Sequence, residues 1–206
     1  MYNKKKLTQR SINAKETRDE IYNSAILLFS KYGYDRVTIE DITKHAGVSK
    51  GSFYNHFISK ESVFVELFHR IDQHYNEVFE NVDSNFTTVK KLRILIGAMC
   101  DYVYNICGID AMRVVYASQI STTKNVAILN DKSRPFYYFI HKIVVEGQEN
   151  GEFRDDISSE YLTELIARYQ RGLLFDWCLY GDQFDLLAES KKYTDITLSS
   201  IIKKNK

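Results

Sequence analysis

Two short helical segments separated by a glycine turn occupy residues 39–56, and they constrain the fold more than any other part of the sequence. Thr38 precedes the first segment and Ser49 precedes the second, and each hydroxyl can accept a hydrogen bond from a backbone N–H of the first helical turn. Between them, Gly47 can adopt the left-handed conformation that other residues resist. The spacing predicts a helix-turn-helix with helices over about 39–45 and 50–56.

Longer helical patterns surround this unit. Apolar residues recur at steps of three and four between about 15 and 31, where Gly33 supplies a stop, and again from Ser59 through Phe79. The chain has one proline and nine glycines in 206 residues, which favours helices over a sheet with many turns. We therefore predict an all-α fold, with a loop at 81–86 and further helices near 88–106, 110–118, 133–149, 158–180 and 184–203. Residues 121–132 are the segment that the pattern determines least.

Charge divides the chain into two parts. Residues 1–60 hold eleven Lys and Arg against six acidic residues, a net charge of +5, whereas residues 61–206 hold seventeen against twenty-one, a net charge of −4. A basic segment suits a polyanionic partner such as DNA. We predict a helix-turn-helix DNA-binding domain over 1–60 and a larger helical domain over 61–206. Lys4, Lys5, Lys6 and Arg10 form either a DNA-contacting arm or a solvated, disordered tail.

The second short helix is the one that enters the major groove in a helix-turn-helix protein. Its apolar residues can face a small core with Phe29, which leaves polar side chains on the outside. Lys50 can reach a phosphate or guanine, and Asn55 can pair with adenine. A compact three-helix unit with a merely polar surface is the alternative. The predicted DNA-contacting residues are Thr38, Lys44, Ser49, Lys50, Gly51, Ser52, Tyr54, Asn55, His56 and Lys60.

The sequence from Thr17 to Phe68 closely resembles the TetR family of bacterial repressors. The resemblance is carried by Gly-Val-Ser-Lys-Gly at 47–51, Tyr-x-His-Phe at 54–57 and Ser-Lys-Glu at 59–61, and it covers about a quarter of the chain. It implies that Thr38, Tyr54, His56 and Lys60 hold the DNA backbone while Lys50, Ser52 and Asn55 face base edges.

The resemblance also implies a helical, ligand-binding body whose last two helices form a four-helix dimer bundle, as opposed to an amphipathic pair folded only on its own core. Gly172 can permit close approach of helices there. The apolar stripes of these helices predict a dimer interface made of Leu162, Leu165, Ile166, Leu173, Trp177, Ile196 and Ile201.

The middle of the chain is rich in aromatic residues, which either pack the core or line a ligand pocket between helices. Side chains from different helices are the best pocket candidates. The absence of an evident charged cluster among them favours an apolar or aromatic effector. The candidates are Met99, Tyr102, Cys107, Met112, Tyr116, Phe139 and Tyr169.

Other functional classes find little support. The sequence contains no GxSxG, P-loop, GxGxxG or HExxH motif, so we predict no catalytic residue and no cofactor. The histidines lack metal-ligand spacing, and the odd number of cysteines without a CxxC pair favours reduced core thiols over a disulfide or metal site. No apolar run approaches the roughly 18 residues of a membrane span, so we expect a cytoplasmic protein that does not associate with membranes.

These features predict a ligand-responsive transcriptional regulator, most simply a repressor. A homodimer would place two recognition helices in successive major grooves, roughly 34 to 36 Å apart, on a near-palindromic double-stranded operator. A small molecule bound in the body would release it. The alternative function is a DNA-localised protein-interaction module without a small-molecule effector.

Overall fold

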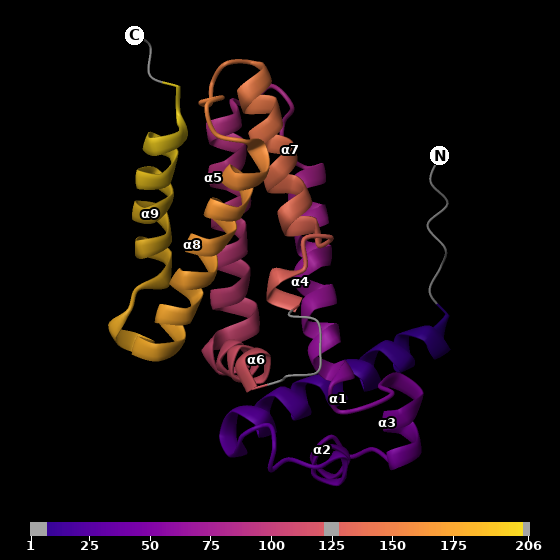
Figure 1. Cartoon of the computed structure of the whole chain (residues 1–206). Helices are drawn as coiled ribbons and strands as arrows, with labels where there is room; N and C mark the ends of the chain where they lie inside the picture. The colour runs from indigo at the N-terminus through magenta and orange to yellow at the C-terminus, as the bar shows by residue number, and fades with distance from the viewer. Residues whose placement is uncertain (1–7, 122–127, 204–206) are drawn as a thin grey trace. The chain divides into compact units, whose positions relative to one another are not determined.

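The computed structural model describes residues 8–121 and 128–203, which form helices (Figure 1). No β-strand occurs within these two ranges, and a single isolated bridge joins Phe153 to Ile202. The predicted all-α fold class is confirmed. The chain divides into two compact units, Met1–Leu67 and Phe68–Lys206, so the division falls inside a helix rather than at the predicted position after residue 60.

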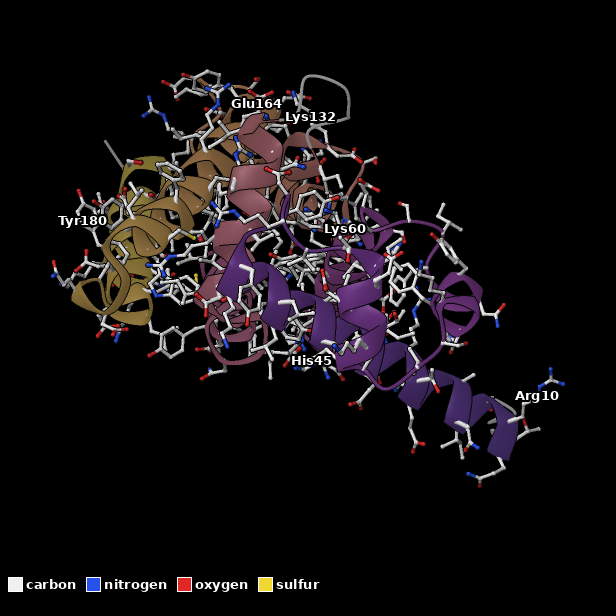
Figure 2. All side chains as sticks on the ribbon, turned by 90° about the horizontal axis from the view of Figure 1, so that it is seen from below. Arg10, His45, Lys60, Lys132, Glu164 and Tyr180 are labelled. Carbon is white, nitrogen blue, oxygen red and sulfur yellow. The ribbon has the colours of Figure 1, made fainter. Side chains whose placement is uncertain are left out.

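The first unit contains α1 (Gln9–Tyr32), α2 (Ile39–His45), α3 (Lys50–His56) and the start of α4 (Ser62–Glu80). α1 begins well before the predicted residue 15, because the Thr8 side chain accepts a hydrogen bond from the Ser11 N–H. Arg10 therefore lies in the first turn of α1 rather than in an arm (Figure 2). Lys4, Lys5 and Lys6 lie outside the described residues.

The turns and caps of this unit follow the sequence closely. Gly33 and Gly47 have φ values of 83° and 67°, in the region that favours glycine. The Thr38 and Ser49 hydroxyls accept hydrogen bonds from the Asp41 and Ser52 N–H groups, which confirms both predicted caps. The core of the unit consists of Ile21, Ala25, Phe29, Ile42, Phe53, Phe57 and Val63, all buried.

The second unit is a bundle in which α7 and α9 each pack against both α5 and α8, and α6 packs against α8 (Figure 1). A π-helical turn at Val103–Cys107 joins α5 directly to α6, where the sequence predicts a break, and Gly108 has a φ of 77°. Short 3-10 turns occupy Ile128–Asn130 and Gly181–Gln183. The helices are α5 (Thr88–Tyr102), α6 (Gly108–Ser121), α7 (Pro135–Glu149), α8 (Ser159–Tyr180) and α9 (Leu186–Ile201).

One helical stretch, Thr88–Ala117, is long and apolar enough by length and composition to cross a membrane. The expectation from the sequence concerned unbroken apolar runs, none of which approaches 18 residues, whereas this stretch is interrupted by a few charged residues. Core helices of helical bundles meet the same criteria. Leu92, Leu95 and Val115 in this stretch are fully buried within the second unit.

Gly147 lies directly against the Phe153 ring in the second unit. A Cβ atom at this position would lie 2.2 Å from the Phe153 ring, which is fully buried and whose backbone N–H donates to the Gly147 carbonyl at 2.8 Å. Because the ring has no free space into which to move, we expect Gly147→Ala to lower the free energy of unfolding by about 1–3 kcal/mol. Urea denaturation measures the change.

Gly97 in α5 provides the matched control, because an added Cβ there meets nothing within 4 Å. Gly97→Ala should leave stability unchanged or raise it by up to about 1 kcal/mol, since alanine is the better helix former. Equal unfolding midpoints for the two variants would show that the Phe153 ring does not restrict Gly147.

Candidate nucleic-acid interface and interior cavity

The outer face of α3 presents polar side chains, while its apolar side anchors the helix. Lys50, Gly51, Tyr54 and Asn55 are exposed on one face, whereas Phe53 on the opposite side is fully buried. The neighbouring predicted residues follow the same division: Thr38, Lys44 and Ser49 are exposed, and Ser52, His56 and Lys60 are half-buried. The structure thus places most of the predicted residues on α3 and at the two caps that precede α2 and α3, with Lys44 in the last turn of α2 and Lys60 between α3 and α4.

The Lys50 ammonium is paired with the Glu40 carboxylate of α2, a partner that the sequence reading missed. The hydrogen bond from Lys50 holds the pKa of Glu40 below its usual range. Both side chains are more than half exposed, and exposed ion pairs contribute little net stability. A phosphate or a guanine can therefore replace Glu40 as the partner of the Lys50 ammonium at a small cost in free energy.

Thr38 is committed to the cap of α2. Its hydroxyl donates to the Asp41 carboxylate at 2.7 Å, and its backbone N–H donates to the same oxygen at 2.9 Å. These bonds lower the pKa of Asp41. Since the one hydroxyl hydrogen is already used, Thr38 positions the start of α2 and has no free side-chain donor for a phosphate.

Lys60 also differs from the expected phosphate ligand. Its ammonium donates to the carbonyls of Tyr34 at 2.7 Å and Val37 at 3.0 Å, and it lies 4.0 Å from the centre of the Tyr34 ring. Two of its three N–H donors thus hold the loop between α1 and α2. Lys60 therefore stabilises the structure of the first unit.

We expect Lys60→Met to lower the stability of the first unit by about 1–3 kcal/mol, because two charge-assisted hydrogen bonds are lost. The slope of log operator affinity against log salt concentration should stay unchanged, since no phosphate contact is removed. Thermal unfolding and affinity titrations at several salt concentrations measure both quantities.

Lys44→Met is the matched comparison, because the Lys44 side chain is exposed at the end of α2. It should leave stability unchanged and reduce the slope of log affinity against log salt by about 0.9, the value for one phosphate contact. A reduced slope in the Lys60 variant would show that Lys60 does contact a phosphate.

Arg18 is a structural residue of the site that the sequence reading did not single out. Its guanidinium donates to the His56 carbonyl at the end of α3 at 2.8 Å and to the Glu66 carboxylate of α4 at 2.7 Å, and it lies 4.7 Å from the centre of the Phe57 ring. It therefore ties α3 to both α1 and α4. The signal was a cation within the apolar stripe of α1 that also contains Ile21.

The second unit contains a partly open cavity of about 50 Å³. Of the seven predicted pocket residues, Met99, Met112 and Tyr116 line it. The remaining wall comes mainly from α4, α7, α8 and the turn at Ile128–Asn130, and it consists of Phe68, Ile71, Tyr75, Val103, Leu129, Arg134, Phe136, Tyr137, Gln170, Arg171 and Leu174.

The other four candidates point elsewhere. Tyr102 stacks on His74 with ring centres 4.3 Å apart, and Phe139 stacks on Phe79 at 4.0 Å. The Tyr169 hydroxyl lies 3.1 Å from the Thr194 hydroxyl, and burial raises the pKa of Tyr169 to about 12. Cys107 belongs to the π-helical turn and does not line the cavity. Helical periodicity alone cannot tell which neighbouring helix a buried side chain meets.

The cavity wall is more polar than the sequence indicated. Arg134 at the start of α7 donates to the Asp72 carboxylate of α4 at 2.8 and 3.2 Å, and its guanidinium lies 4.6 Å from the centre of the Phe68 ring. Arg171 from α8 also lines the cavity. The sequence showed no charged cluster among the candidate pocket residues, because these two arginines lie far apart in sequence and come to one cavity wall only in the folded bundle.

The three cysteines are free thiols. Burial raises the pKa of Cys100 to about 11, of Cys107 to about 12 and of Cys178 to about 11. All three are therefore protonated and unreactive at neutral pH. Within residues 8–121 and 128–203, no group of three or more His, Cys, Asp or Glu side chains is placed to hold a metal ion.

Most of the predicted dimer residues lie inside the chain itself. Leu162, Ile166, Leu173, Trp177 and Ile201 are at most 5% exposed. Because these side chains already fill the core of one subunit, they are not available to a second one. Leu165 and Ile196 are exposed, at 38% and 65%, and the other exposed apolar side chains of α8 and α9 are Tyr161, Phe175, Leu179, Tyr180 and Tyr193.

An exposed, polar recognition helix on a capped three-helix unit defines a DNA-binding helix-turn-helix protein, and comparisons with known proteins agree. Residues 21–67 match the family described as "Bacterial regulatory proteins, tetR family". The transcriptional repressor DhaR of Mycobacterium sp. strain GP1 is 29% identical over 165 residues, which cover 76% of this chain and 80% of that protein. The fatty acid metabolism regulator of Bacillus subtilis is 21% identical over 88% of this chain and 94% of its own.

Solved structures show the same fold. The fatty acid degradation regulator FadR of Bacillus halodurans superposes with a TM-score of 0.77 at 20% identity, over 94% of this chain and 97% of that one. FadR of Bacillus subtilis, in complex with stearoyl-CoA, gives a TM-score of 0.74 at 21% identity, over 89% and 98%. The chain is a DNA-binding transcriptional regulator. Its residues 21–67 form the part of the chain that matches the TetR family of bacterial regulatory proteins.

Proposed function

We propose that this regulator is a repressor that binds a palindromic operator as a homodimer and releases it when a small molecule enters the second unit. The observation that carries the proposal is the exposed face of α3, where Lys50, Tyr54 and Asn55 lie opposite the buried Phe53. Lys50 and Asn55 read base edges, and Tyr54 with His56 contacts phosphate oxygens. Ser49 and the exposed Gly51 leave room for the duplex.

The exposed faces of α8 and α9 support the homodimer. Leu165, Phe175 and Leu179 form an apolar stripe on α8, and Ile196 adds to it on α9. Gly172 lies on the same stripe, is exposed and has nothing within 4 Å of an added Cβ, so a second helix can approach closely there. Two such pairs of helices bury each other's apolar surface in a symmetric bundle.

The cavity supports the ligand response because α4 forms part of its wall. Phe68, Ile71 and Tyr75 of α4 line the cavity, and the same helix continues from the first unit at Ser62. A ligand that pushes this wall changes the position of α4 and favours a state that no longer matches the groove spacing of the operator. The B. subtilis FadR structure with stearoyl-CoA is an instance of a ligand-bound relative of this fold. The protein-interaction alternative gains no comparable support.

The test is to find which genomic fragments the purified full chain retains at physiological salt, followed by sequencing of the retained DNA. We expect enrichment of one or a few inverted repeats whose half-sites are one helical turn apart. Uniform retention of all fragments, weakened evenly by salt, would mean backbone binding only and would contradict the proposal.

A further inference from the structure

The cavity contains one guanidinium that has no carboxylate partner. Arg134 is paired with Asp72, whereas all the hydrogen bonds of Arg171 within the described part of the chain go to neutral groups, the Tyr137 hydroxyl and the Leu129 carbonyl. The cavity-lining residues include these two arginines and no acidic side chain. The charge of Arg171 acts on the Glu164 carboxylate of the same helix, but that carboxylate is already paired with Lys132 and Arg168, so Arg171 has no hydrogen-bonded carboxylate of its own.

The backbone carbonyls that accept hydrogen bonds from these groups are distant. Arg134 donates to the Ile128 carbonyl at 3.5 Å, and Arg171 and the Tyr137 hydroxyl both donate to the Leu129 carbonyl at 3.4 Å. Charge-assisted bonds from guanidinium to carboxylate are usually about 2.7–2.9 Å long and roughly twice as strong as neutral ones. The two carbonyls thus occupy acceptor positions that a carboxylate would fill better.

Gln170 and Tyr116, two further polar residues of the wall, already have hydrogen-bond partners within the protein. The Gln170 amide donates to the Tyr169 hydroxyl at 2.8 Å, and its carbonyl accepts from the Cys100 thiol. The Tyr116 hydroxyl donates to the Arg171 carbonyl at 2.8 Å. The cavity therefore lacks an anionic acceptor for the Arg171 guanidinium. The surrounding side chains of the wall are mainly aliphatic and aromatic.

We propose that the effector is an amphipathic monocarboxylate, whose carboxylate binds the Arg171 guanidinium and the Tyr137 hydroxyl. Its apolar part lies among Phe68, Met99 and Met112. This inference rests on the proposed ligand response and specifies the chemical class of the ligand.

The size of the cavity indicates how such a ligand enters. The cavity of about 50 Å³ offers a few times the roughly 10–15 Å³ that one water molecule requires, which is too little for an eight-carbon chain, so the wall must move to admit an effector. The turn at Ile128–Asn130 is the part of the wall held to the arginines and Tyr137 by three long hydrogen bonds. When the carboxylate of the ligand binds the Arg171 guanidinium, it replaces the Leu129 carbonyl there. The turn at Ile128–Asn130 is then free to move outward.

The test compares octanoate with 1-octanol and octylamine, which share one apolar chain and differ in the charge of the head group. Isothermal titration of the full chain should show octanoate binding at least tenfold more tightly than either of the others. Arg171→Met should remove this preference, a loss of about tenfold to a hundredfold for octanoate, while leaving octanol binding unchanged. Octanol binding by the variant also verifies that its cavity is folded.

Lys192 provides the matched control, since its ammonium pairs with Glu189 on α9 and neither residue lines the cavity. Lys192→Met should keep the preference for octanoate. Octanol or octylamine binding as tightly as octanoate, an unchanged preference in the Arg171 variant, or no binding of any of the three would overturn the inference. Binding of octanoyl-CoA without binding of octanoate would likewise exclude a carboxylate at Arg171.

Retention of the selected operator is measured in the same samples, which separates the two proposals. Octanoate binding that depends on Arg171 but leaves operator affinity unchanged supports the carboxylate site and contradicts the release mechanism. Specific operator binding without octanoate binding contradicts the carboxylate site and leaves the DNA-binding function standing.

Discussion

Replacing Lys50, Tyr54 and Asn55 together with alanine is expected to abolish specific operator binding and leave the fold unchanged. All three side chains are exposed on α3, whereas Phe53, which anchors the helix, is untouched. Good base contacts contribute about 1–3 kcal/mol each, so the triple variant should lose about a thousandfold or more in affinity for the selected palindrome. Fluorescence anisotropy with the palindrome and a scrambled duplex measures the loss.

The variant should bind the scrambled duplex only slightly more weakly, because phosphate contacts elsewhere remain. Tyr138→Ala with Lys142→Ala is the matched control, since these side chains are exposed on α7 of the second unit. That control should bind the palindrome with unchanged affinity. Retention of sequence preference by the α3 variant would show that another element reads the operator.

Leu165→Glu combined with Ile196→Glu is expected to convert the proposed dimer into folded monomers. The proposed interface would then bury several carboxylates of like charge across the two-fold axis, at a cost of several kcal/mol per uncompensated ion. Since both side chains are exposed in the single chain, the subunit fold should survive. Operator affinity should fall at least about a hundredfold, because each monomer engages a single half-site.

Analytical ultracentrifugation at micromolar concentration measures the association, and anisotropy measures the affinity. Ile106→Glu is the control, because this side chain is 67% exposed in the π-helical turn, away from α8 and α9 in sequence. It should sediment like the unchanged protein. A double variant that still sediments as a dimer would place the interface on another surface.

Sequence reasoning succeeded where structure depends on local interactions. The Thr38 and Ser49 caps and the positive φ of Gly47 involve residues within one turn of each other, so residue type and spacing were sufficient. The exposed face of α3 followed from the same short-range pattern. Reasoning was less successful for Lys60, because its ammonium binds carbonyls more than twenty residues earlier in the chain.

The sequence by itself determined the helical fold class, the recognition helix and its outward side chains, because capping, glycine turns and helical periodicity are properties of neighbouring residues. Tertiary structure alone decided which apolar stripe of α8 packs in the core and which remains exposed. Helical periodicity places side chains around one helix but does not show which other helix packs against each face. The tertiary structure also brought Arg134 and Arg171 into one cavity wall. Their common position depends on how α7 and α8 pack. The Arg171 guanidinium without a hydrogen-bonded carboxylate therefore became apparent only in the folded bundle.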